Sequence, residues 1–155
     1  MSAKGNFKLR PAKQSDGSEI AAVFSPSLRL LTFLPPLHSV EHNKWFIDNV
    51  ILAECEVTVA TSNGSVVAFL ALQGEEIRLL HTHPDFVGRG AGSLLVRHAQ
   101  SNRASTLELW CFQANAGARR FYERHGFHPV LFTDGIRNEE KIPDVQYRWK
   151  REGVS

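Results

Sequence analysis

The sequence predicts one α+β domain over residues 1–155, with elements in the order β-α-α-β-β-β-α-β-α-β-β. Three observations lead to this prediction. Residues 55–82 read as three consecutive strands, two helical patterns follow in the second half, and no repeat, low-complexity tract or linker divides the chain. A chain of 155 residues is long enough to bury a normal hydrophobic core.

The first segments are predicted to be a strand and a helix. Residues 7–11 read as the strand, and apolar residues between Glu19 and Phe24 recur at helical spacing. Side-chain oxygens that could cap this helix come from Ser15, Asp16 and Ser18. Pro26 is expected to break the helix or restart it, because proline lacks the amide hydrogen used inside a helix.

A second helix and a three-stranded meander are predicted next. Ser39 precedes a helical face that carries Trp45 and Phe46. Strands are then expected at residues 55–62, 65–73 and 76–82. Asn63–Gly64 separates the first two of these strands, and this pair is a strong hairpin signal because both residues tolerate positive φ angles.

The second half alternates helices and strands. A helix that begins near Ala91 is followed by a strand at 106–112. A second helix is predicted between Asn115, its N-cap, and Gly126, its C-cap residue. Strands at 128–132 and 145–149, joined by a polar loop, complete the chain.

Composition excludes several classes of partner. The net charge is +2 and the basic residues are scattered, so no nucleic-acid partner is expected. No apolar run reaches the roughly 18 residues of a membrane span, and the polar N-terminus lacks the apolar region of a signal peptide. Cys55 and Cys111 stand far apart without metal spacing, which favours a reduced, cytoplasmic protein.

Three glycines stand at a strand-to-helix junction within HTHPDFVGRGAGSLLVRHAQ, residues 81–100. Gly88, Gly90 and Gly92 do not complete a G-x-G-x-x-G motif, because Ser93 replaces the third glycine, and no lysine completes a Walker A loop. Small residues still let a loop wrap an anion, toward which the first N–H groups of the helix point. The alternative is a plain turn that needs positive φ angles.

Two motifs resemble those of the GCN5-related N-acetyltransferases, the GNAT superfamily. LHTHPDFVGRGAGSLL resembles motif A, Q/R-x-x-G-x-G/A, with Gly90 and Gly92 as its glycines and Val87 where Gln or Arg is most common. NAGARRFYERHGF resembles the later motif N-x-x-A-x-x-F-Y-x-x-x-G-F. Its matching positions are Asn115, Ala118, Phe121, Tyr122, Gly126 and Phe127. The order of elements fits this family along the whole chain.

The resemblance implies a GNAT fold, α+β, whose central sheet is mixed but mostly antiparallel and flanked by about four helices. It implies a small bacterial-type N-acetyltransferase, an acyltransferase that moves an acetyl group from acetyl-CoA to a primary amine by direct transfer in a ternary complex. It also implies that acetyl-CoA is bound by Leu80, His81, Thr82, Val87, Gly88, Arg89, Gly90, Ala91, Gly92, Ser93, Asn115 and Tyr122.

Tyr122 is the candidate general acid. The thiol formed when the thiolate leaves has a pKa of about 8.5, and a tyrosine phenol has a pKa of about 10. A phenol beside the sulfur can therefore supply a proton as the C–S bond breaks. The alternative is a core aromatic residue beside Phe121. Asn115 lies seven residues from Tyr122, two helical turns, so one ligand could touch both. Three roles are open to Asn115: to hold the pantetheine arm, as the resemblance implies, to cap its helix, or to do both.

Two residues are candidates for the general base. The alignment puts Glu76 where histone-acetylating relatives carry their catalytic glutamate, although a solvated carboxylate would look the same. His81 has a suitable near-neutral pKa. On a regular strand the two residues would face opposite sides, but the bulge that this family carries would shift that phase. Water, or an amine that arrives deprotonated, is the third option.

The remaining predictions concern the backbone, metals and cysteines. In this family the bulged strand, here at residues 80–82, pairs with the pantetheine amides and polarises the thioester carbonyl. No metal site is expected, because no carboxylate or cysteine completes the set His81, His83, His125 and His128. Cys55 and Cys111 are expected to be inert, since the family transfers the acetyl group directly.

The amine acceptor is not identified by the sequence. In the GNAT fold that the resemblance implies, the first two helices and the loop between the last two strands line the acceptor groove. In this sequence those segments carry His38, Glu41, His42, Asp134, Glu139 and Glu140. Ordinary solvated loops would also contain such residues. Two other functions are a non-catalytic acyl-CoA-binding or sensing module and an interaction domain without a ligand. A homodimer is possible, because the last strands of this fold often pair between subunits.

Overall fold

The computed structural model describes residues 6–35, 38–102 and 105–153. It confirms the predicted order of elements, with small shifts at their ends. The strands are β1 (Lys8–Pro11), β2 (Glu56–Ser62), β3 (Ser65–Gln73), β4 (Glu76–Thr82), β5 (Thr106–Phe112), β6 (His128–Phe132) and β7 (Asp144–Lys150). The longer helices are α1 (Gly17–Arg29), α2 (Val40–Phe46), α4 (Ala91–Asn102) and α5 (Ala116–Arg124). Short helical turns are η1 (Gln14–Asp16), η2 (Ile47–Ile51), α3 (Leu52–Glu54) and η3 (Pro84–Phe86).

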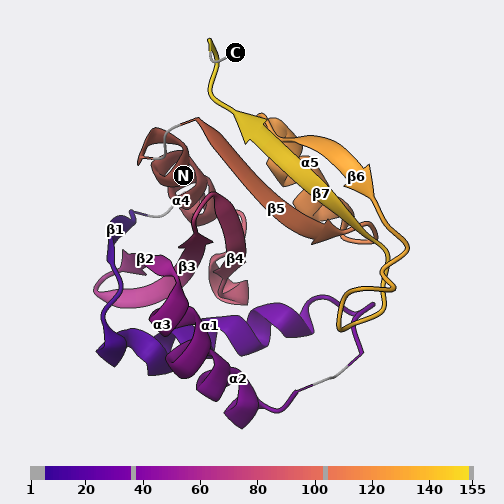
Figure 1. Ribbon diagram of the computed structural model, residues 1–155. Coiled ribbons are helices and arrows are strands. Elements are labelled where there is room, and N and C mark those ends of the chain that lie inside the picture. Colours follow the sequence, from indigo (N-terminus) through magenta and orange to yellow (C-terminus); the bar gives the residue numbers. More distant parts are fainter. Residues whose placement is uncertain (1–5, 36–37, 103–104, 154–155) are drawn as a thin grey trace.

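The seven strands form one mixed sheet in the order β1-β2-β3-β4-β5-β7-β6. Every neighbouring pair is antiparallel except β4 and β5, which are parallel and pair only where Glu76 lies opposite Glu108. Beyond that position the two strands diverge, so the sheet opens between β1–β4 and β5–β7 (Figure 1). The candidate active site lies at this opening.

A β-bulge in β4 determines which residues share a face. Ile77 pairs with Leu72 and Leu79 pairs with Ala71, so Arg78 is the extra residue. Glu76 and His81 pair with Gln73 and Phe69, which lie four residues apart on β3 and therefore face the same side. The bulge thus brings Glu76 and His81 to one face of the sheet, as the family resemblance implied.

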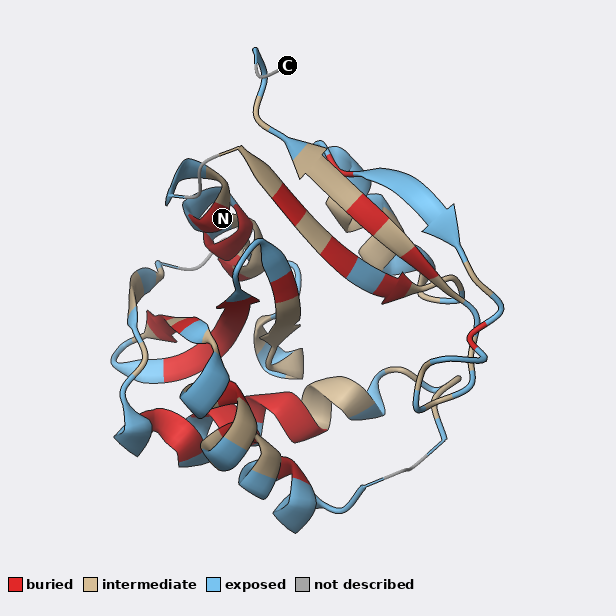
Figure 2. Cartoon of the chain, viewed as in Figure 1, coloured by how far each residue is buried: buried red, intermediate tan, exposed pale blue. Residues whose placement is uncertain are grey.

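Two hydrophobic clusters cover the two faces of the sheet. One packs α4 and the residues after α5 onto the sheet through Leu95, Leu107, Phe127 and Tyr147, each at most 1% exposed. The other packs α1 and η2 against β2 and β3 around Ile20, Val23, Ile47 and Phe69. β3 is buried on both faces from Val66 to Leu72, whereas every residue of edge strand β6 is exposed (Figure 2).

The predicted hairpin is confirmed at the turn between β2 and β3. Asn63 and Gly64 have φ angles of 49° and 82°, the left-handed pair that a type I′ turn requires. Ser39 is the N-cap of α2, because its side chain accepts from the amide of His42 at 3.0 Å.

Two predictions about the first helix are wrong. α1 runs through Pro26 without a break, because a proline near the end of a helix removes only one backbone hydrogen bond. Asp16 occupies the N-cap position but makes no capping bond from its side chain, and neither Ser15 nor Ser18 takes that place. The carboxylate of Asp16 turns instead to β1.

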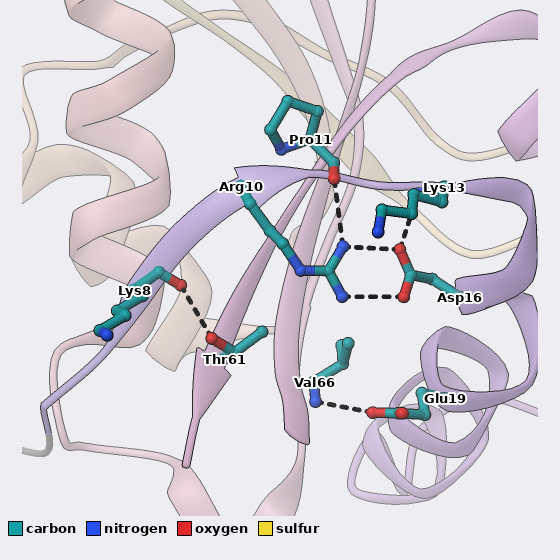
Figure 3. A network of polar contacts seen from close by, with 8 residues as sticks. All are labelled: Lys8, Arg10, Pro11, Lys13, Asp16, Glu19, Thr61 and Val66. Atoms are coloured by element: carbon teal, nitrogen blue, oxygen red, sulfur yellow. Dashed lines mark hydrogen bonds and ion pairs between the residues drawn. The ribbon is translucent and has the colours of Figure 1, made fainter. Parts of the chain in front are cut away.

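Asp16 joins β1 to the start of α1 (Figure 3). Its two oxygens accept from the guanidinium of Arg10 at 2.8 and 2.9 Å, and one also accepts from the amide of Lys13 at 2.7 Å. The bond from Arg10 is the main cause that lowers the pKa of Asp16 to about 2. Nearby, Glu19 accepts from the amide of Val66 at 2.8 Å and so links α1 to β3.

Candidate active site

The glycine loop, residues 87–93, connects η3 to the first turn of α4. Gly88 and Gly90 have φ angles of 81° and 98°, and an added Cβ at either would meet open space. Glycine is therefore favoured there by backbone conformation rather than by crowding. A Cβ on Gly92 would lie 3.4 Å from Cζ of Phe121, an ordinary van der Waals contact, so crowding does not by itself require glycine here.

The loop leaves the start of α4 free to bind an anion. The helix ladder begins where the amide of Leu94 donates to the carbonyl of Gly90 at 3.1 Å. The amides of residues 91–93 precede that bond and belong to the free donors of a helix N-terminus. Arg89, whose guanidinium carbon lies 5.2 Å from the centre of the Phe86 ring, adds positive charge. Val87 is exposed and adds no polar side chain.

A cleft of about 460 Å³ opens where β4 and β5 diverge. Four of the predicted site residues line it: Leu80, His81, Asn115 and Tyr122. Apolar side chains from α1 and the segment after it form one wall, namely Phe24, Leu28, Leu31 and Leu34. Thr82 is the last residue of β4 and directly follows His81. Its Oγ1 lies 3.9 Å from a Cβ placed on Gly92, so Thr82 connects the cleft to the glycine loop.

Tyr122 directs its hydroxyl toward this cleft. Its ring packs against Phe121, Phe127 and Tyr147, with centroid distances of 5.2 to 6.4 Å. The hydroxyl has no hydrogen-bond partner among the described residues. In that part of the chain, every side-chain nitrogen or oxygen that is fully buried does have a partner, so the hydroxyl is not fully buried. The hydroxyl must therefore be accessible from the cleft. Burial of the surrounding ring raises its pKa above the usual tyrosine value, so the phenol stays protonated.

The helix that carries Tyr122 is held at both ends. Asn115 is confirmed as its N-cap, because Oδ1 accepts from the amide of Ala118 at 3.1 Å. Gly126 follows the helix with a φ of 86°, and the amide of Phe127 donates to the carbonyl of Tyr122 at 3.1 Å, a Schellman ending. The side-chain NH₂ of Asn115 makes no bond to a described residue and remains available to a ligand in the cleft.

His81 lies on β4, across the cleft from Tyr122, and three neighbouring side chains fix its ring. Phe24 contacts the imidazole edge-on at 5.0 Å and Phe69 stacks on it at 5.8 Å. Its Nδ1 lies 2.9 Å from Oγ of Ser27. Burial lowers the pKa of His81 to about 4. The near-neutral pKa expected from the sequence is therefore wrong, and the ring is neutral at physiological pH.

Glu76 lies apart from these residues. It is exposed at the start of β4 and lines a separate hollow of about 260 Å³ with Gln73, Glu75, Glu108, Trp110 and Gln146. Trp110 lines both this hollow and the cleft. The structure therefore brings His81, and not Glu76, into the same cleft as Tyr122.

The two cysteines are unpaired, and Cys111 lines the cleft. Burial raises the pKa of Cys111 to about 11 and also raises that of Cys55, so both are thiols near neutral pH. Within the described ranges, no three His, Cys, Asp or Glu side chains are grouped as metal ligands would be. Nor does that part of the chain contain a helix long and apolar enough to cross a membrane.

The acceptor end of the cleft gathers side chains from both halves of the chain. Nε2 of His38 lies 2.7 Å from Oε1 of Glu139, in the loop between β6 and β7. His42 stacks on His38 with a centroid distance of 4.1 Å. Glu140 also lines the cleft. Of the other candidates, Asp134 lines a further hollow of about 670 Å³, and Glu41 is exposed on α2.

Sequence reasoning missed Ser27 and the apolar wall from α1. Ser27 lies 54 residues from His81, and no local pattern links a serine at the end of one helix to a histidine on a distant strand. The apolar residues of α1 and the segment after it read as ordinary core positions.

The sequence is similar to those of known N-acetyltransferases. Residues 53–129 match the family described as acetyltransferase (GNAT) domain. The peptidyl-lysine N-acetyltransferase YjaB of Salmonella typhimurium is 30% identical over 123 residues, which cover 78% of this chain and 83% of the relative. The peptidyl-lysine N-acetyltransferase YiaC of Escherichia coli is 27% identical over 143 residues, which cover 88% and 94%.

Solved structures share the fold. The apo form of YjaB from Escherichia coli superimposes with a TM-score of 0.77 at 23% identity and covers 93% of this chain and 97% of its own. The PaiA N-acetyltransferase of Thermoplasma acidophilum, solved with coenzyme A, gives a TM-score of 0.71 at 17% identity, covering 94% and 99%. YncA of Salmonella typhimurium, solved with acetyl-CoA, gives 0.71 at 15% identity, covering 97% and 98%.

Fold and site together define an acyltransferase that acts on nitrogen. The chain belongs to the GNAT family of N-acetyltransferases, as its two motifs indicated. Of the solved relatives, the one from Thermoplasma acidophilum holds coenzyme A and the one from Salmonella typhimurium holds acetyl-CoA.

Proposed function

We propose that this chain moves the acetyl group of acetyl-CoA to a primary amine by direct attack within a ternary complex. One observation carries the proposal: Tyr122 and His81 open onto a single cleft, at the point where β4 and β5 diverge. A hydrogen-bonding acid and a neutral imidazole are thus available to the same reacting centre.

The cosubstrate fits the residues around this cleft. The amides of the glycine loop, residues 87–93, would bind the pyrophosphate, since two positive φ angles shape the loop and the first donors of α4 are free. Beyond Glu76, the edge of β4 that faces β5 has no strand partner in the described sheet, so residues 80–82 are free to pair with the pantetheine amides. The NH₂ of Asn115 offers one more donor.

Tyr122 is the proposed general acid. When the C–S bond of the thioester breaks, the phenol gives its proton to the sulfur. The raised pKa of Tyr122 keeps that proton in place until the thiolate forms.

The proposed base is His81 or Glu76. His81 is supported by its position in the cleft beside Tyr122. Glu76 is supported by the bulge at Arg78, which gives it the same face as His81, but its separate hollow requires a water to carry the proton.

Direct transfer is supported by the state of Cys111. It is a cysteine that lines the cleft, and burial raises its pKa to about 11. Because the thiolate is the nucleophilic form, Cys111 is a poor acceptor for the acetyl group at neutral pH. The amine itself is therefore the proposed nucleophile.

Lysine amines of proteins or peptides, and small primary amines, are the proposed acceptors. Two relatives are named peptidyl-lysine N-acetyltransferases. The apolar wall suits the methylene stem of such an amine, and Glu139 and Glu140 suit its positive charge before it loses a proton.

We further propose a cytoplasmic homodimer that uses no nucleic acid or membrane. Two free cysteines suit a reducing compartment. Edge strand β6 exposes Val130, Leu131 and Phe132 by 44–54%, and a second copy could cover this unpaired edge. Molecular mass measured in solution tests the dimer.

The test of the function is a titration of purified protein with acetyl-CoA, coupled to thiol release across a panel of amines and lysine peptides. Saturable binding and turnover that falls in Tyr122→Phe are expected. Binding without turnover on any amine would point to the sensing module instead. Absence of binding would contradict the proposal.

A further inference from the structure

Ser27 and His81 form a polar contact beside the cleft, which His81 lines. Ser27 lies in the last turn of α1, and its Oγ is 2.9 Å from Nδ1 of His81 on β4. Two phenyl rings fix the plane of the imidazole, Phe24 at 5.0 Å and Phe69 at 5.8 Å. The rings and the hydroxyl together leave the imidazole one orientation.

This orientation leaves the other ring nitrogen open. Nε2 of His81 has no hydrogen-bond partner among the residues that the structure describes, and no buried side-chain nitrogen or oxygen there is unpaired. Nε2 is therefore not buried, and the accessible space beside it is the cleft that also receives the hydroxyl of Tyr122. A histidine that only filled the core would not need one nitrogen kept accessible.

A serine hydroxyl suits both protonation states of the ring. Toward a neutral imidazole it can donate to Nδ1 or accept from it, because a hydroxyl is both donor and acceptor. Once Nε2 has taken a proton, Nδ1 carries a hydrogen as well, and Oγ of Ser27 accepts it. The same contact therefore holds the ring before and after proton transfer.

The segment that presents Ser27 is itself fixed. Ser25, two residues earlier, is buried and accepts from Nδ2 of Asn43 at 3.0 Å, which ties the end of α1 to α2. Pro26 lies between the two serines and restricts the backbone. Ser27 is thus a preorganised partner rather than a mobile surface hydroxyl.

We propose that Ser27 is a positioning residue for acetyl transfer, holding His81 by Nδ1 so that Nε2 accepts the proton of the attacking amine. This inference rests on the proposed function, with His81 as the base. The amine nitrogen bonds to the carbonyl carbon and loses its proton to Nε2, while the C–S bond breaks and sulfur takes the proton of Tyr122. Water then returns the proton from Nε2 to the phenolate, so that both side chains are restored.

Burial, and no neighbouring charge, sets the pKa of His81. Titratable or charged side chains that line the same cleft are His38, His42, Arg78, Cys111, Tyr122, Glu139 and Glu140. None of these shifts the pKa of His81, which burial alone lowers to about 4. Above that pH the ring is neutral, and Nε2 can accept a proton.

Three variants test the role of Ser27: Ser27→Ala, Ser27→Thr, which keeps a hydroxyl, and Ser18→Ala, an exposed serine at the start of α1, as control. We expect kcat to fall about 10- to 100-fold in Ser27→Ala, up to the loss caused by a misplacement of about 1 Å. The KM for acetyl-CoA and the Ser18→Ala variant should be unchanged, and Ser27→Thr should recover most of the activity.

Two further measurements make the result specific. ¹⁵N shifts of the His81 ring, followed against pH without substrates, should change in Ser27→Ala and remain near wild type in Ser27→Thr. In a His81→Phe background, Ser27→Ala should cause no further loss of kcat. This non-additivity separates positioning from a general loss of stability.

Unchanged ring shifts, or equal kcat in Ser27→Ala and Ser18→Ala, would overturn the inference while leaving the acetyltransferase function intact. If wild type acetylates no amine at all, the proposed function fails and the role of Ser27 in transfer fails with it. The two failures are therefore distinguished by the wild-type reaction alone.

Discussion

The hydroxyl of Tyr122 on α5 and the imidazole of His81 on β4 line the same cleft, although 40 intervening residues, 82–121, separate them in sequence. They share the cleft because β4 and β5 are parallel neighbours that diverge after a single paired position. In an antiparallel pair fully joined along its length, this space would be filled by the sheet itself. The opening is thus the feature of the fold on which the proposed acid–base pair depends.

Tyr122→Phe should lower kcat by about 10²–10⁴-fold, the usual contribution of a positioned proton donor. Because burial raises the pKa of Tyr122, the acid form persists as pH rises, and wild-type kcat should not fall before pH 10, the ordinary tyrosine value. Steady-state kinetics from pH 6 to 10 check this. A fall centred near pH 8 that Tyr122→Phe abolishes would contradict the raised pKa.

Gly90→Val should weaken acetyl-CoA binding at least 10-fold, a loss of about 1.4 kcal/mol. At a φ of 98° valine is strained, so the loop would leave its cradle conformation. Gly64→Val is the matched control, because Gly64 also has a positive φ, 82°, and open space around it, but lies in the β2–β3 hairpin. Calorimetric titration of both variants checks the prediction. Equal affinities would show that the loop does not bind the cosubstrate.

Cys111→Ala should retain most of the acetyl transfer activity. Neither this variant nor wild type should form a covalent acetyl-enzyme. A thiol whose pKa is raised to about 11 is almost entirely protonated at pH 7.5, so it neither attacks acetyl-CoA nor reacts quickly with iodoacetamide. Intact mass after incubation with acetyl-CoA alone is the measurement. An added acetyl group on Cys111 that then passes to an amine would replace direct transfer with a two-step reaction.

Asp16→Asn should reduce the free energy of unfolding at pH 7 by about 1–3 kcal/mol, because the paired charge and its charge-assisted bonds to Arg10 are lost. The folded pKa of Asp16, about 2, lies below the ordinary 3.8. Its contribution is therefore complete above pH 3.8 and disappears as pH falls through 2, so the two proteins should converge in stability over that range.

The matched control for Asp16 is Asp48→Asn. Asp48 pairs with Lys44 at 2.6 Å on the surface, where such a pair contributes only about 0.3–0.5 kcal/mol. Chemical denaturation at several pH values compares the variants. An equal loss in both would mean that the Arg10–Asp16 contact is no stronger than an ordinary surface pair.

The sequence predicted those parts of the fold and of the candidate site that depend on local conformation. Gly88 and Gly90 need positive φ, Asn115 caps its helix, and Asn63–Gly64 makes a hairpin turn, all of which short-range geometry dictates. Each of these signals lies within a few residues of its effect. The same locality explains why both motifs of the family could be recognised.

Contacts between distant segments could not be predicted in this way. Asp16 looked like a helix cap, but a guanidinium from β1 offers its carboxylate two stronger bonds. Ser27 carried no signal at all, because its partner His81 lies on another element. Glu76 aligned with a catalytic position, and yet it opens onto a different hollow, since the sheet diverges only beyond it.

Glu140→Gln should raise the KM for a cationic amine by about 3–10-fold and leave kcat within about 2-fold, since it removes a charge that attracts the substrate but touches no reacting atom. Glu140 is half-buried at the acceptor end of the cleft, whereas Glu41 on α2 is exposed and lies outside the cleft, so Glu41→Gln is the control. Added salt should narrow the difference between wild type and Glu140→Gln, because screening weakens the same attraction. If both variants raise KM equally, the effect comes from net charge, and the acceptor is not recognised by the loop between β6 and β7. If only Glu140→Gln does, and more strongly for amines on long methylene stems, then the carboxylate and the apolar wall of α1 act together on the acceptor.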